Sequence, residues 1–112
     1  EDKLKKKYSG NESPFFTIEA MNYIVDLGVK HLLVDFPSVD RLLDEGKLTC
    51  HNIFWQTNNK KLNKDTMEKT ITEMIFISDK IADGKYLLNI QIPSFVSDAA
   101  PSKPIIFQVN EI

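Results

Sequence analysis

The sequence lacks several features that would place it in a well-marked class of proteins. It has a single cysteine, Cys50, among 112 residues, which excludes an internal disulfide framework and a zinc site built from several cysteines. No apolar run approaches the roughly 20 residues that span a bilayer, and no signal-peptide pattern is present. We therefore expect no membrane partner and a cytoplasmic location.

The charge is also nearly balanced, because 14 basic and 16 acidic residues give a net charge of −2. The one basic cluster, residues 3–7, follows two acidic residues and contains no aromatic side chain that could stack on a base. We expect no nucleic-acid partner. With 42% hydrophobic and 27% charged residues, the composition is that of a globular protein, and we expect residues 1–112 to form a single domain.

The order of the polar and apolar segments predicts an α+β fold. Ile18, Met21, Ile24 and Val25 recur at helical spacing, between Thr17 as a candidate N-cap and Gly28 as a candidate C-terminal residue. Segments rich in apolar and β-branched residues predict strands at 29–36, 53–55, 70–77, 85–93 and 105–109. The polar segment 58–69 is expected to be a surface excursion. The prediction is a mixed sheet of four or five strands with one main packing helix.

Four short segments that contain polar residues follow one another in a characteristic order around these predicted strands. It reads Asp35-Phe36-Pro37-Ser38-Val39-Asp40, then His51-Asn52-Ile53-Phe54, then Thr72-Glu73-Met74-Ile75, and finally Leu88-Asn89-Ile90-Gln91-Ile92-Pro93. The ordered set resembles the C-terminal half of the cyclase family of metal-dependent hydrolases, which includes bacterial kynurenine formamidases (arylformamidases). The resemblance runs from about Pro14 to Val109. The first-half signature of that family, His-x-Gly-Thr-His-x-Asp, does not occur in this sequence.

The resemblance implies a swivelling β/β/α fold and a divalent-metal site, with zinc or manganese as the ion. In that family the residues matching His51 and Glu73 are metal ligands, and the remaining ligands come from the first half. The implied reaction is hydrolysis of a small amide or formamide such as N-formylkynurenine, a step of tryptophan catabolism. The chain would be the C-terminal portion of a larger hydrolase, inactive alone. The segment 58–69 is longer than the family usually shows.

The residue types suit this chemistry independently of the family. Imidazole and carboxylate groups are ligands for zinc and manganese, and a metal-bound water becomes a nucleophile near neutral pH. A ligating histidine commonly donates its other N–H to a carboxylate, a role open to Asp35 or Asp40. We expect no catalytic residue within the chain and no bound organic cofactor.

Other polar residues have ordinary explanations. Ser38 lacks the Gly-x-Ser-x-Gly context of a nucleophile and is expected to form turn hydrogen bonds. Cys50 precedes His51 in what is expected to be an extended segment, where adjacent side chains diverge, so a Cys–His pair is not expected. His31, at the start of a strand, is expected to lie at a rim.

The alternative hypothesis is that the chain is a non-catalytic binding or assembly module. The strands predicted near residues 32–36, 71–77 and 87–92 are apolar on most positions, whereas one helix covers only one face of a sheet. A large exposed apolar face usually marks a partner surface. We therefore expect this chain to pack against the remainder of its own protein or against another copy, as a homo-oligomer.

Overall fold

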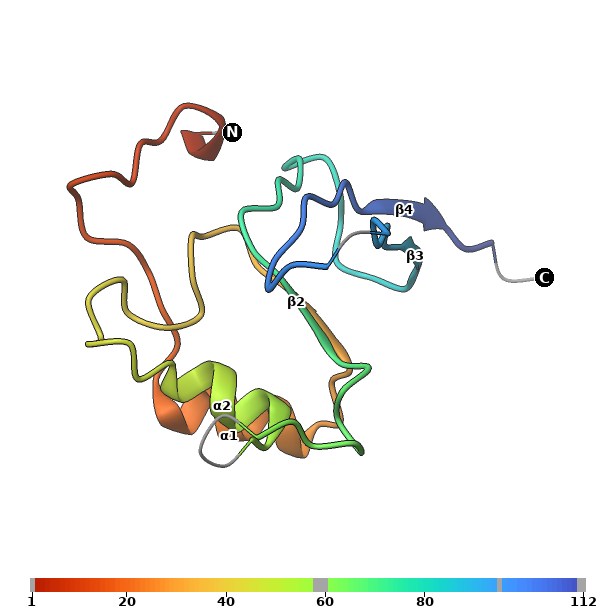
Figure 1. Cartoon of the computed structure of the whole chain (residues 1–112). Coiled ribbons are helices and arrows are strands. Elements are labelled where there is room, and N and C mark those ends of the chain that lie inside the picture. The colour runs from red at the N-terminus through yellow and green to blue at the C-terminus, as the bar shows by residue number, and fades with distance from the viewer. Residues whose placement is uncertain (1, 58–60, 95, 111–112) are drawn as a thin grey trace. The chain divides into compact units, whose positions relative to one another are not determined.

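The computed structural model describes residues 2–57, 61–94 and 96–110, which form two compact units (Figure 1). The larger unit spans Asp2–Phe76 and the smaller unit spans Ile77–Ile112. The larger unit contains η1 (Asp2–Leu4), α1 (Ile18–Asp26), β1 (His31–Leu33), α2 (Thr49–Trp55) and β2 (Thr70–Thr72). The smaller unit contains β3 (Tyr86–Asn89) and β4 (Ile105–Gln108). The α+β class is confirmed, and whether 1–112 folds as one domain stays a prediction.

The prediction of one mixed sheet of four or five strands is wrong for the described residues. β1 and β2 form a parallel pair, with Leu32 opposite Ile71, and β3 and β4 form a separate antiparallel pair, with Leu87 opposite Phe107. All four strands are shorter than predicted. The apolar runs continue past the strand ends because side-chain pattern alone does not show where the backbone pairing stops.

The first helix forms where the sequence predicts it. Thr17 caps α1, its Oγ1 accepting a hydrogen bond of 3.2 Å from the backbone N–H of Ala20. Gly28 follows the helix with a φ of 74°, a left-handed conformation that costs glycine no steric strain. Met21 is fully buried, but Ile18 is half exposed, so the predicted apolar stripe is narrower than its spacing suggests.

The prediction of a strand at 53–55 is wrong, because these residues end the second helix, α2. Cys50 and Phe54, four residues apart, both face the interior, so the segment has the spacing of a helix. The residue at its N-cap position, Leu48, makes no side-chain cap hydrogen bond. The capping group comes instead from Asp40, ten residues before Cys50. A prediction from the residues next to the helix does not find a cap so far away in the sequence.

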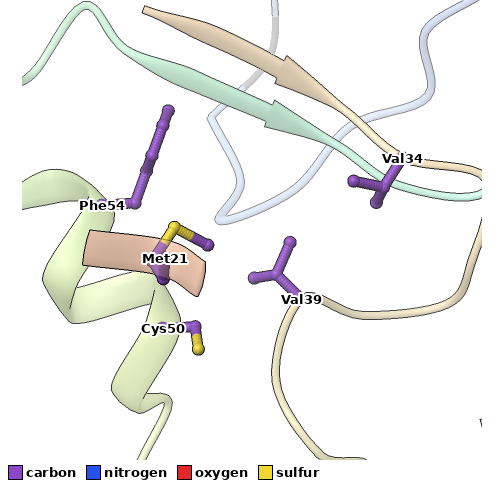
Figure 2. Packing of buried hydrophobic residues seen from close by; sticks show 5 residues of the cluster. All are labelled: Met21, Val34, Val39, Cys50 and Phe54. Carbon is purple, nitrogen blue, oxygen red and sulfur yellow. The ribbon is translucent and has the colours of Figure 1, made fainter. Parts of the chain in front are cut away.

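The core of the larger unit lies where α1, α2 and the segment after β1 meet. Its buried residues are Met21, Val34, Val39, Cys50 and Phe54, and Figure 2 shows them converging from both helices and from either side of the turn after β1. The two helices pack directly on each other. This packing fixes the N-terminal end of α2 next to the segment that carries Asp40.

Candidate functional site

His51, Asp40 and Glu73 come together within the larger unit, although they are far apart in the sequence. His51 lies in the first turn of α2, Asp40 in the turn that follows β1, and Glu73 directly after β2. Of the two predicted ligands, His51 and Glu73, the structure places His51 Nε2 3.6 Å from Glu73 Oε1. Their side chains are 21% and 29% exposed, so both can be reached from solvent.

Asp40 holds the other edge of the His51 ring. Its Oδ2 lies 2.7 Å from His51 Nδ1, and its side chain is almost completely buried. Asp40 also accepts hydrogen bonds from two backbone N–H groups at the start of α2, those of Cys50 at 2.7 Å and His51 at 3.1 Å. These donors have no partner within the helix, and a negative charge there complements the helix dipole.

The ionisation of Asp40 decides which nitrogen of His51 carries the proton. Burial alone would raise the pKa of Asp40, but hydrogen bonds from the His51 side chain and from the backbone N–H groups of Cys50 and His51 outweigh it and lower that pKa. An ionised carboxylate only accepts hydrogen bonds, so Nδ1 of His51 must donate. In the neutral imidazole, Nε2 therefore keeps a free lone pair on the side of Glu73.

The position of the Glu73 carboxylate is set by a hydrogen bond to the backbone and by the backbone conformation of the next residue. Its Oε1 accepts a hydrogen bond of 3.0 Å from the backbone N–H of Val39. The next residue, Met74, has a φ of 58°, which is unusual for a residue with a side chain, and its N–H donates to Phe36 O at 3.1 Å. Ile75 also stays bonded to the segment after β1, since its N–H donates to Val34 O at 3.0 Å. The regular pairing of β1 and β2 ends at Thr72, and the chain turns at Glu73–Met74, where the Glu73 carboxylate lies near His51.

The spacing of His51 and Glu73 fits two ligands of one ion. A zinc ion lies about 2.0–2.1 Å from a histidine nitrogen and about 2.0–2.2 Å from a carboxylate oxygen, so two ligand atoms of a tetrahedral ion lie about 3.4 Å apart. The 3.6 Å between Nε2 and Oε1 is close to that separation. No group of three or more His, Cys, Asp or Glu side chains able to hold a metal occurs in the part of the chain that the structure describes.

The structure separates the two candidates for the partner of His51. Asp40 contacts His51, whereas Asp35 forms an ion pair of 2.5 Å with Lys3. Ser38 Oγ accepts a hydrogen bond of 3.2 Å from the backbone N–H of Asp40, which confirms its predicted role in the turn. His31 is exposed at the start of β1, with Nδ1 2.9 Å from Thr70 Oγ1.

Cys50 is part of the core and does not pair with His51. The expectation that an extended backbone separates the two side chains is wrong, since both lie on α2. Cys50 instead faces inward, where its Sγ lies 3.5 Å from Phe16 O. Burial, and then the negative charge of Asp40, raise the pKa of the Cys50 thiol to about 11. The thiol stays protonated near neutral pH, which leaves it a poor nucleophile.

Sequence reasoning missed one residue at the site, Trp55. Its ring stacks on that of His51, with centroids 5.8 Å apart and an angle of 27° between the planes. The signal was the spacing, because residues four apart are neighbours on a helix surface. The prediction of a strand at 53–55 hides this spacing, because side chains four apart in a strand are not direct neighbours.

Comparisons with known proteins give no relative for this chain. No family model matches the sequence, and neither the curated proteins nor the solved structures contain a significant match. In the part of the chain that the structure describes, no helix is long and apolar enough to cross a membrane.

Proposed function

We propose that this chain supplies part of the metal site of a hydrolase of the cyclase family, with His51 and Glu73 as two ligands of a zinc or manganese ion. The observation that carries the proposal is the 3.6 Å approach of His51 Nε2 to Glu73 Oε1, with the opposite nitrogen held by Asp40. A histidine ligand oriented by a carboxylate is a common arrangement at metal sites. The proposal keeps the swivelling β/β/α fold, the cytoplasmic location and a role in tryptophan catabolism as its finer expectations.

Each residue has a defined part in this proposal. Asp40 fixes the tautomer of His51, so that Nε2 is free to bind a cation. Glu73 contributes a negatively charged oxygen whose position is set by the N–H of Val39. When bound, the metal ion would supply an activated water for attack on an amide or formamide carbonyl. The other ligands and the substrate-binding residues would come from the rest of the protein, which also explains why the chain alone is expected to be inactive.

The experiment is a comparison of two histidine variants in the product of the full-length gene. His51→Ala should lower hydrolysis of N-formylkynurenine at least a hundredfold, with a melting midpoint close to that of the parent, because the ring lies at the edge of the core. His31→Ala, at the other histidine of the chain, is the matched control and should keep normal turnover. Normal turnover in a folded His51→Ala protein would refute the ligand assignment.

The second candidate, a binding or assembly module, is favoured by the smaller unit. None of its described residues is buried, and both faces of the β3–β4 pair carry exposed apolar side chains. We propose that these faces are covered by the remainder of the same protein or by another copy. The two candidates are compatible if the covering part also brings the missing ligands.

A further inference from the structure

Trp55 is enclosed by contacts that fix its ring as well as its backbone. The indole Nε1 donates a hydrogen bond of 2.9 Å to Lys69 O, and the edge of the neighbouring Phe54 ring lies against it at a centroid distance of 5.7 Å. The backbone carbonyl of Trp55 accepts a hydrogen bond from Thr66 Oγ1. The ring of His51 stacks on the same indole.

The residues that enclose Trp55 belong to one segment, which also closes the end of α2. Three of its side chains donate to three consecutive backbone carbonyls at the C-terminus of the helix. Lys69 donates to Phe54 O, Thr66 donates to Trp55 O, and Asn63 donates to Gln56 O. We call these three residues the clamp. Carbonyls at a helix end have no partner within the helix, so each of these hydrogen bonds satisfies a group that the helix leaves unpaired.

Lys69 shows that the clamp is built into the protein and does not merely lie on its surface. Its Nζ lies 2.7 Å from Phe54 O and 4.0 Å from the centroid of the Phe54 ring. Burial lowers the pKa of this ammonium group, a cost that an exposed lysine avoids. The sequence predicts a surface excursion across residues 58–69, yet the described part of that segment holds a buried threonine and a partly buried lysine against the helix.

The clamp is needed because α2 is short. A helix of seven residues has little stability of its own, and its last residue is the first to fray. Trp55 is that last residue. Asp40 alone fixes one nitrogen of the imidazole and leaves the tilt of the ring free.

We infer that Trp55, seated by the clamp, is a positioning residue that holds the His51 imidazole so that Nε2 faces Glu73. The role deepens the proposed function, since it is useful only if Nε2 binds a ligand. It assigns to the segment 61–69 a part in the site, although none of its residues touches His51 directly in the contacts given above. Trp55 acts through His51 and is not itself a ligand.

The first test needs no metal. Carbon-13 and nitrogen-15 NMR on the 112-residue chain can follow the rings of its two histidines separately. We expect the His51 ring protons to be shifted by the ring current of the indole relative to those of His31, with an order parameter of the His51 ring clearly higher than that of the exposed His31 ring. His51 protons that resonate like those of His31 in the unmodified chain would overturn the inference, whatever any variant does.

Substitutions at Trp55 separate stacking from simple occupancy of the space. In Trp55→Leu the order parameter of the His51 ring should fall toward that of the exposed His31 ring, while that of His31 is unchanged. Trp55→Phe loses the Nε1 hydrogen bond but keeps an aromatic face, and it should restore most of the order. Tyr23→Leu removes an exposed aromatic ring from α1 and is the matched control, with no effect expected on His51. Equal order in the leucine and phenylalanine variants would refute a stacking role.

The clamp has its own pair of variants. Lys69→Met removes the hydrogen bond to Phe54 O but keeps the carbonyl that Trp55 contacts, and it should loosen the His51 ring in part. Lys64→Met, at an exposed position of the same segment, should leave the ring as it is. An unchanged ring in folded Lys69→Met protein would show that the clamp does not act on His51.

Zinc titration distinguishes failure of this inference from failure of the proposed function. Residues that orient a ligand typically contribute about 10–100-fold to metal affinity, so Trp55→Leu should weaken zinc binding about tenfold and Trp55→Phe much less. If His51→Ala weakens binding and Trp55→Leu does not, the positioning role is wrong and the ligand assignment stands. If His51→Ala has no effect, the proposed function itself fails.

Discussion

At the scale of single residues, Asp40 contributes both to the fold and to the candidate site. The same carboxylate accepts hydrogen bonds from the first turn of α2 and from the ring of His51. A substitution there therefore changes both the stability of the protein and the orientation of the imidazole. The two effects can be separated by their dependence on pH.

We predict that Asp40→Asn lowers the free energy of unfolding at pH 7 by about 1.5–3 kcal/mol, the usual contribution of hydrogen bonds to a charged group. The pKa of Asp40 is lowered in the folded protein, so the stabilisation by its charge is present above the unfolded value of about 4 and is lost as pH falls through the folded value. The deficit of the variant should therefore shrink in acid. Urea unfolding of both proteins at several pH values measures it, and a deficit independent of pH would show that the charge of Asp40 does not matter.

At the scale of elements, the end of β2 is shaped by an unfavourable backbone conformation. Met74 has a φ of 58° and a side chain that is 58% exposed, so neither packing nor propensity favours this residue there. A left-handed conformation costs an ordinary residue about 1–2 kcal/mol. The strained residue lies directly beside Glu73, whose Oε1 accepts a hydrogen bond from the N–H of Val39.

We predict that Met74→Gly raises the free energy of unfolding by up to about 1 kcal/mol, because relief of the backbone strain exceeds the added entropy of the unfolded chain. Met67→Gly is the matched control, at a methionine that is similarly exposed but has no positive φ. That change should lower stability. Equal effects of the two substitutions, measured by urea unfolding, would mean that Met74 is not strained.

The elements also show what the sequence can predict and what it cannot. Thr17 and Gly28 act within a few residues of the helix that they bound, and both ends of α1 follow from them. The cap of α2 comes from Asp40 and its closing hydrogen bonds come from residues as far away as Lys69, so no capping residue next to α2 marks its ends. Only the four-residue spacing of Cys50 and Phe54 indicates the helix. His51 and Glu73 were predicted to meet through a family resemblance. The stacking of Trp55 was not predicted, because it depends on the helix that was missed.

At the scale of the whole molecule, the two units differ in how completely they bury their apolar residues. The larger unit has a core that includes the fully buried Met21, Val39 and Phe54. The smaller unit holds a two-stranded sheet and has no buried residue among those described. An isolated two-stranded sheet is marginally stable in water, so we expect this unit to pack against a further surface.

We predict that the isolated 112-residue chain self-associates and binds a hydrophobic dye, because Leu87 and its cross-strand neighbour Phe107 are 64% and 55% exposed. Leu87→Ser combined with Phe107→Ser should reduce both effects. Leu43→Ser, at an exposed position of the larger unit, is the control and should not. Light scattering over a dilution series measures association. A monomer that binds no dye would remove the support for a covering partner.

The most direct test of the proposed metal site is a zinc and manganese titration of the isolated chain. The variants His51→Ala, Glu73→Gln and His31→Ala are measured in parallel. Two ligands leave most of the coordination shell to water, so we predict weak binding of one ion that is lost on dialysis. Binding should be abolished by His51→Ala, weakened by Glu73→Gln and unchanged by His31→Ala. Stoichiometric zinc that survives dialysis would contradict the incomplete site, and binding unaffected by His51→Ala would contradict the site itself.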